Sequence, residues 1–125
     1  MSKHIEKGID GEKLAVQHLR GKGYEILHTN WKHGKAEVDI VAEKEGLIII
    51  AEVKTRATDY FGAPEEAVHK QKERMLVKAA EAYLETNNID KEIRYDVISI
   101  VLNDKQTKID HIEDAIYPFA SELDE

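Results

Sequence analysis

The sequence contains no cysteine, only two prolines and no long hydrophobic run. The lack of cysteine excludes a disulfide framework and a thiolate metal site. The longest apolar run, residues 47–51, is far too short to cross a bilayer, and the first residues, Met1 to His4, lack the apolar stretch of a signal peptide. We therefore expect a cytoplasmic protein without a membrane partner.

The chain also lacks the basic excess that is typical of nucleic-acid-binding proteins, because its formal net charge is -7. The acidity is concentrated in residues 79–125, which hold four basic and twelve acidic side chains, whereas residues 1–56 hold ten basic and nine acidic ones. The net charge therefore argues against tight non-specific binding to DNA, but it leaves room for a local basic groove.

A chain of 125 residues without repeats or linkers indicates one domain over residues 1–125, with an acidic tail from about residue 113. Apolar spacing predicts one helix over residues 2–20, capped by Ser2, and another from Pro64 to about Glu85. Strands are predicted over residues 24–31, 37–43, 47–55, 93–102 and, at an edge, 107–112. Because a helix separates them, strands 47–55 and 93–102 are expected to pair in parallel. The predicted fold is α/β, a mixed β-sheet of about five strands flanked by helices.

The strand over residues 47–55 carries charges where they are costly. Its first half is apolar on both faces, which is typical of a central strand, yet Glu52 and Lys54 follow. Side chains alternate along a strand, so these two project from one face, about 7 Å apart. Buried charges are expensive unless they are paired or coordinate a metal.

The preceding strand supplies further carboxylates. Alternation puts Glu37 and Asp39 on one face, and Val38 and Ile40 on the other. If the hairpin is symmetric about residues 44 and 45, Glu37 lies opposite Glu52 and Asp39 lies diagonal to it, although a one-residue slip would reverse the faces. Whether Glu37 belongs to the site stays open, since it could instead bond a backbone amide or Lys54.

A third carboxylate, Glu12, falls within the apolar stripe of the first helix, at the spacing 5, 9, 12, 16 and 19. Glu12 could instead be rotated to the rim or bonded to a lysine, but we favour a place in the site. Oxygen ligands without cysteine or clustered histidine suit Mg²⁺ or Mn²⁺ and not Zn²⁺.

Asp39, twelve intervening residues and then Glu52-Val53-Lys54 form the pattern D-x(12)-E-x-K, which resembles the PD-(D/E)xK nuclease superfamily. The resemblance implies a restriction-endonuclease-like fold in which Asp39, Glu52 and the carbonyl of Val53 bind metal. Lys54 would position or deprotonate the attacking water. Phosphodiester cleavage needs an activated nucleophile and neutralised transition-state charge, which a metal ion and a lysine can supply together.

Further motifs extend the likeness over roughly residues 8–102. In chain order they are Gly8, Gly11-Glu12, Ala15, Gly23-Tyr24, Asn30-Trp31, Glu37 to Ala42, Glu52 to Arg56, Phe61-Gly62, Lys72 and Arg94 to Val97. Together they resemble the YraN-type family of uncharacterised bacterial endonuclease-like proteins, which is similar to archaeal Holliday-junction resolvases. One departure is Ala36, which stands where the family usually has glycine.

This resemblance implies a Mg²⁺- or Mn²⁺-dependent endonuclease acting on DNA, with branched or structured DNA as its substrate and a role in repair or recombination. Glu12 matches the helix-borne catalytic acid, and Lys72 matches a basic position that could touch phosphate. A symmetric substrate would suit a homodimer.

Other interpretations stay open. Thr55 and Arg56 are candidates for nucleic-acid contact, but Arg56 could simply flank the strand end, and Lys72 could belong to a solvated helix flank. Asp96 lies in a strand that looks buried and could be structural, accepting a hydrogen bond from a nearby amide. The alternative functions are a non-catalytic nucleic-acid-binding or recombination-accessory protein, and an interaction module that uses the acidic C-terminal third.

Overall fold

The computed structural model describes the backbone of residues 3–57 and 66–115, and the side chains of residues 11–57 and 72–115. Two helices and five strands follow one another in the order α1 (Lys3–Gly21), β1 (Glu25–His33), β2 (Ala36–Lys44), β3 (Leu47–Arg56), α2 (Glu66–Thr86), β4 (Ile93–Leu102) and β5 (Thr107–Ile112). The predicted helix starts at Ser2 and Pro64, and most of the acidic tail, lie outside the described residues. No helix in the described ranges is long and apolar enough to cross a membrane.

The strands form one mixed sheet in the order β1-β2-β3-β4-β5. β3 and β4 pair in parallel, and the other neighbouring strands are antiparallel. The prediction of an α/β fold with a mixed five-stranded sheet is confirmed, as is the parallel pair joined through a helix.

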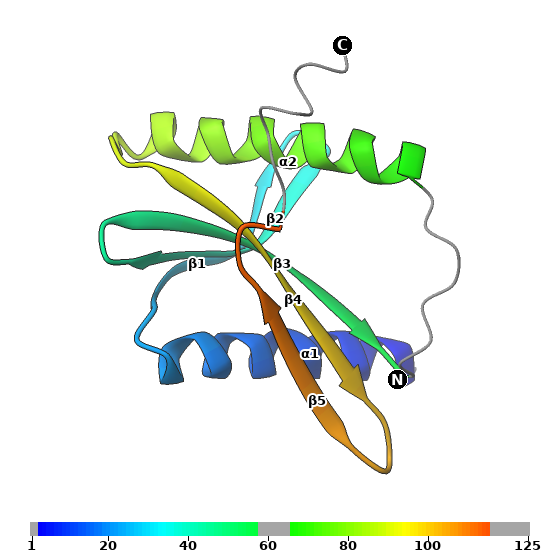
Figure 1. Ribbon diagram of the computed structural model, residues 1–125. Helices are drawn as coiled ribbons and strands as arrows, with labels where there is room; N and C mark the ends of the chain where they lie inside the picture. The colour runs from blue at the N-terminus through cyan, green and yellow to red at the C-terminus, as the bar shows by residue number, and fades with distance from the viewer. Residues whose placement is uncertain (1–2, 58–65, 116–125) are drawn as a thin grey trace.

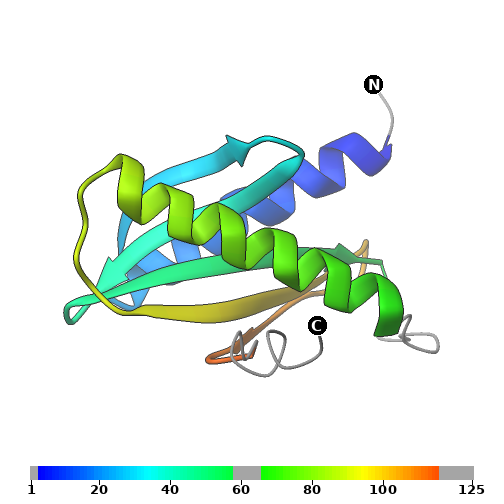
Figure 2. The ribbon, with the colours of Figure 1, turned by 90° about the horizontal axis from the view of Figure 1, so that it is seen from above.

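The helices cover opposite faces of the sheet, α1 on one side and α2 on the other (Figure 1). Seen from above, α2 runs across the strands (Figure 2). Two apolar cores result. The core between α2 and the sheet consists of the buried residues Val38, Val41, Ile48, Ile50, Leu76, Val77, Ala79, Ala80, Tyr83 and Tyr95. The core between α1 and the sheet consists of Ala15, Leu19, Tyr24, Ile40, Ala42, Ile49, Ala51, Ile98 and Ile100.

The register of the β2–β3 hairpin differs from the prediction. Its turn consists of Glu45 and Gly46, both with positive φ (52° and 82°), as a two-residue type I′ turn requires. The ladder runs from Lys44↔Leu47 to Ile40↔Ala51. Continued by one step, this register places Asp39 opposite Glu52, so the prediction that Glu37 takes that position is wrong. The prediction centred the turn one residue too early.

The alternation of side chains in β2 also breaks near its middle. Val38 packs beneath α2, but Ile40 packs beneath α1, so the prediction that these two residues share a face is wrong. In β1, Asn30 lies opposite Asp39, because Thr29 pairs with Ile40 and Trp31 with Val38. Asn30 has a φ of 52°, far from the extended conformation, so the irregularity involves both strands.

Asp96 is structural, as the sequence indicated. Its side chain is fully buried in β4 and accepts hydrogen bonds from Arg94, from the Asp114 backbone amide (3.0 Å) and from the His111 ring (2.7 Å). Burial opposes ionisation, yet these bonds outweigh it and lower the pKa of Asp96. The carboxylate thereby ties β4 to the segment that follows β5.

Candidate metal centre

The candidate site lies where β2 and β3 part. Their ladder ends at Ile40↔Ala51, and the next residues are Asp39 and Glu52. The backbone N–H of Val53 donates to Oδ2 of Asp39 at 2.8 Å. This bond holds the partly buried Asp39 carboxylate against β3 beyond the last ladder pair.

Glu12 reaches the same place because α1 approaches β3 very closely. Gly11 is buried, and a Cβ added to it would lie 2.0 Å from Oγ1 of Thr55. Only glycine therefore permits this distance between helix and strand. The next residue, Glu12, projects toward β1 and β2, where its Oε2 accepts a hydrogen bond of 3.2 Å from Nδ2 of Asn30.

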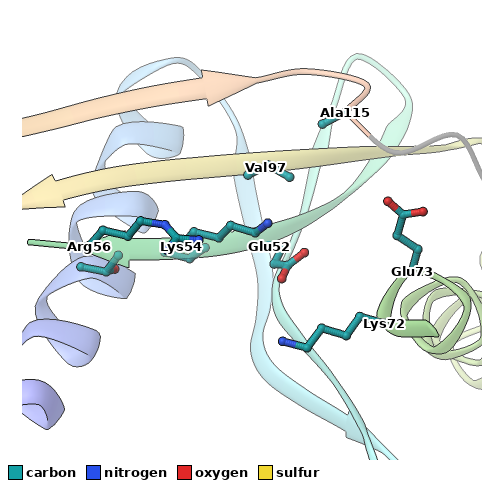
Figure 3. Close-up of a pocket in the computed structure, with 9 residues that line it drawn as sticks. Glu52, Lys54, Arg56, Lys72, Glu73, Val97 and Ala115 are labelled. Carbon is teal, nitrogen blue, oxygen red and sulfur yellow. The ribbon is translucent and has the colours of Figure 1, made fainter. Parts of the chain in front are cut away.

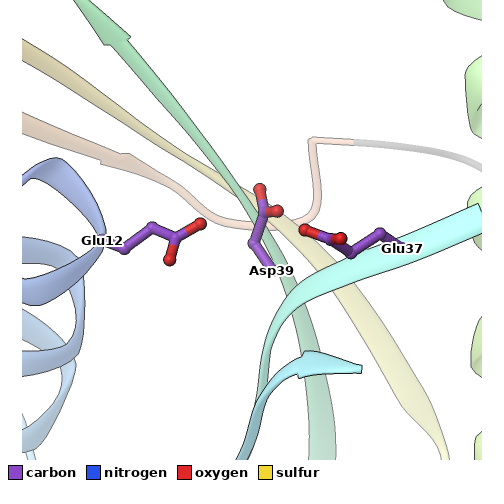
Figure 4. A group of neighbouring side chains, drawn as sticks. All are labelled: Glu12, Glu37 and Asp39. Carbon is purple, nitrogen blue, oxygen red and sulfur yellow. The ribbon is translucent and has the colours of Figure 1, made fainter. Parts of the chain in front are cut away.

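Three carboxylates gather at this point. One oxygen each from Glu12, Glu37 and Asp39 lie within 4.8 Å of one another (Figure 4). The group could hold a metal ion, and its donors are all carboxylate oxygens, which are hard ligands suited to Mg²⁺, Mn²⁺ or Ca²⁺. Glu37, which the sequence left open, is thus a member of the group. Glu52, which was predicted to be a ligand, lies outside it.

The electrostatics of the group centre on Asp39. Burial raises the pKa of Asp39 from its usual 3.8 to about 6. The hydrogen bond from Val53 acts against this increase, while the negative charges of Glu12, Glu52 and Glu37 add to it. An accumulation of negative charge that raises a carboxyl pKa is an arrangement that a cation would relieve.

Two adjoining cavities open beside the carboxylates. The larger, of about 450 Å³, is lined by Glu52, Val53, Lys54, Thr55, Arg56, Lys72, Glu73, Val97 and Ala115 (Figure 3). The smaller, of about 280 Å³, is lined by Lys35, Ala36, Glu37, Asp39, Glu52, Lys72, Met75 and Leu76. Glu52 and Lys72 belong to both linings, so they mark the junction between the acidic group and the larger cavity.

Basic side chains surround that junction. Figure 3 shows the ammonium groups of Lys54 and Lys72 extending toward Glu52, from β3 and from α2. Within the described part of the chain, the side chains of Glu52 and Lys54 have no hydrogen bond or ion pair to another described residue, although both residues are partly buried. Arg56 lines the same cavity further along β3. The cavity therefore presents cationic side chains next to a cluster of carboxylates.

The structure brings together most of the residues that the sequence selected. Asp39 and Glu52 line one cavity, and Glu52, Val53, Lys54, Thr55, Arg56 and Lys72 line the other. Thr55 has a packing contact with Gly11 that sequence reasoning missed. The signal was a glycine inside a predicted helix, which often marks a close approach.

Comparison with known proteins assigns the family. A model of an uncharacterised protein family, UPF0102, matches residues 11–100. The chain belongs to the UPF0102 family. UPF0102 proteins of Flavobacterium psychrophilum and Bacteroides thetaiotaomicron are 47% and 45% identical to it, over 95% and 94% of this chain and 100% and 98% of theirs. UPF0102 is the YraN-type family, so the resemblance stated from the motifs is confirmed.

The UPF0102 match begins at Gly11, which sets the approach of α1, and ends at residue 100, within β4. It therefore includes the three grouped carboxylates and every residue named above as lining the two cavities except Ala115. Among solved structures, that of Pyrococcus furiosus SfsA in complex with Ca²⁺ is 17% identical, with a TM-score of 0.39. The likeness covers 88% of the UPF0102 chain and 63% of the SfsA chain.

Proposed function

We propose that the protein is a divalent-metal-dependent nuclease that hydrolyses phosphodiester bonds in DNA. The observation that carries the proposal is the group of carboxylates of Glu12, Glu37 and Asp39, within 4.8 Å of one another. They adjoin a cavity that is lined by the carboxylate of Glu52 and by the basic side chains of Lys54, Arg56 and Lys72. Anionic ligands beside cationic phosphate contacts are the two requirements of metal-assisted phosphodiester cleavage.

The carboxylates of Glu12, Glu37 and Asp39 would hold the cation. Glu52 and the carbonyl of Val53 are further ligands that the family resemblance implies, and they lie on the β3 side of the same junction. When bound, Mg²⁺ or Mn²⁺ would supply a Lewis acid that offsets phosphate charge and lowers the pKa of water. At neutral pH Asp39 is ionised despite its pKa of about 6, so it can act as a ligand.

The basic side chains of the cavity would act on the phosphate and on water. A water molecule attacks phosphorus and gives up a proton, the bond to the leaving oxygen breaks, and that oxygen takes up a proton. The ammonium group of Lys54 would orient the attacking water and stabilise the charge that develops on the phosphoryl oxygens. Lys72 and Arg56, with Thr55, would contact the phosphates on either side of the scissile bond.

The proposed substrate is branched or otherwise structured DNA, and a homodimer would match a two-fold symmetric junction. Both of these details come from the likeness of the YraN-type family to junction resolvases. They are separate from the metal-dependent hydrolysis, which stands on the arrangement of the side chains.

Cleavage of labelled junction, flap, single-stranded and duplex DNA with Mg²⁺ or Mn²⁺ tests the proposal. Glu52→Ala and Lys54→Ala should each lower the rate at least about 100-fold, the scale of losing one charge-stabilising group. The matched controls Glu81→Ala and Lys108→Ala, at exposed positions on α2 and β5, should leave it unchanged.

Activity that survives in both site variants would identify a contaminating nuclease and contradict the proposal. A wild-type protein that binds DNA but neither cleaves it nor takes up Mn²⁺ would instead be a nucleic-acid-binding protein on this fold. Calorimetric titration with Mn²⁺ separates the two, because the enzyme should bind the ion and lose that binding in Asp39→Asn.

A further inference from the structure

We propose that Asn30 is a positioning residue that holds the carboxylate of Glu12 within the acidic group. The inference rests on the proposed metal-dependent function. It assigns a role to a residue that would touch neither the cation nor the DNA, and that would act through Glu12.

A single contact across the site carries the inference. Nδ2 of Asn30, in β1, donates to Oε2 of Glu12, in α1, at 3.2 Å. Asn30 also lies opposite Asp39 in the β1–β2 register. One side-chain amide thus connects the helix-borne acid to the strand position beside the other two carboxylates.

The backbone of Asn30 restricts which residue can stand there. Its φ of 52° lies in the left-handed region, which few residues adopt readily besides glycine, asparagine and aspartate. Glycine would fit the backbone but has no donor. Aspartate would fit as well, but it would replace the donor with a further negative charge beside three carboxylates. Of these three residues, only asparagine meets both the backbone and the hydrogen-bonding requirement.

The contact matters because Glu12 is a long side chain at a partly exposed position. A glutamate that rotates freely must lose rotamer entropy when it binds an ion, and it is repelled by the carboxylates of Glu37 and Asp39. A neutral donor that holds one of its oxygens reduces both costs before the ion arrives. Partners of this kind typically change metal affinity by about 10- to 100-fold.

Titration calorimetry with MnCl₂ at neutral pH tests the role, with Asn30→Gly and Asn30→Asp as the variants. Asn30→Gly removes the amide and keeps a residue suited to positive φ, so it should weaken Mn²⁺ binding about 10-fold without lowering Tm. Asn30→Asp should weaken binding at least as much. The matched control is Asn88→Gly, because Asn88 has a φ of 53° and is exposed just after α2. It should bind Mn²⁺ like the wild type.

Unchanged Mn²⁺ affinity in both Asn30 variants would overturn the inference and leave the proposed function intact. If the wild type binds no Mn²⁺, the proposed metal dependence fails, and NMR of the metal-free protein then decides the role of Asn30. The side-chain amide signals of Asn30 should shift in Glu12→Gln but not in the control Glu81→Gln. Signals that stay in place would show that Asn30 does not hold Glu12.

Discussion

Replacing Asp39 with asparagine should make the metal-free protein more stable at neutral pH, although it removes a residue of the candidate site. The folded protein holds the pKa of Asp39 at about 6, compared with its usual 3.8, so the ionised form is disfavoured by about two pKa units. At about 1.4 kcal/mol per unit, the negative charge costs up to about 3 kcal/mol of unfolding free energy. Asparagine keeps an oxygen that can accept the hydrogen bond from Val53.

The sign of the pH dependence follows from the raised pKa. Between about pH 4 and pH 6 the folded chain binds more protons at Asp39 than the unfolded chain does. The wild type should therefore lose stability relative to Asp39→Asn as the pH rises through this range. Below it both side chains are neutral and the two proteins should be about equally stable. Above it the difference should reach its full value.

Urea unfolding in EDTA measures this difference, with the fluorescence of Trp31 as the signal, since Trp31 packs edge-on against Tyr83. Asp110→Asn, at an exposed position on β5, is the control for the loss of one negative charge. Mn²⁺ should stabilise the wild type more than the Asp39 variant, because ligand binding to the folded state adds to stability. The prediction would be refuted if the wild type and Asp39→Asn differed in unfolding free energy by the same amount at pH 4 and at neutral pH. It would also be refuted if Asp39→Asn were less stable than the wild type at neutral pH.

Three other substitutions test packing and buried polar contacts by urea unfolding. Gly11→Ala should lower the unfolding free energy by about 1–3 kcal/mol, because its Cβ would meet Thr55. Adding Thr55→Ala to that variant should recover most of the loss, and additive effects of the two substitutions would contradict the contact. Asp96→Ala should cost about 3–5 kcal/mol, since it breaks a buried ion pair, and a loss below about 1 kcal/mol would show that the network is not stabilising. Tyr83→Phe should lower the unfolding free energy by about 1 kcal/mol, because it removes the 2.6 Å hydrogen bond to His28. In a chain that already carries His28→Ala the same substitution should have little effect, and an unchanged cost there would contradict the role of this bond.

Much of the fold was predictable because it depends on local signals. Apolar periodicity located both helices, and the apolar run 47–51 identified the central strand. The parallel pairing of β3 and β4 followed from the helix between them. Asp96 was a candidate structural residue because a carboxylate in a buried strand is normally hydrogen-bonded, and the bond from the Asp114 amide agrees with this.

The register and the membership of the acidic group were not predictable in the same way, because they depend on backbone conformations at single residues. Glu45 adopts a positive φ that centres the turn one residue later than a symmetric reading suggests. Asn30 also adopts a positive φ, at the position opposite Asp39 where the alternation of side chains in β2 breaks. The period of two had already put Glu37 and Asp39 on one face, but it could not show that Glu37, and not Glu52, stands with Glu12 and Asp39.

The missing side chain at Gly11 has a consequence for the ion selectivity of the proposed metal centre. Glu12 belongs to α1, whereas Glu37 and Asp39 belong to the sheet. The distance between the Glu12 carboxylate and the other two therefore depends on how closely α1 approaches the sheet at Gly11. Mg²⁺ requires oxygens at about 2.0–2.1 Å, and Ca²⁺ accepts about 2.3–2.6 Å. A bulkier residue where α1 meets β3 would therefore move the preference of the site toward the larger cation, without changing any ligand.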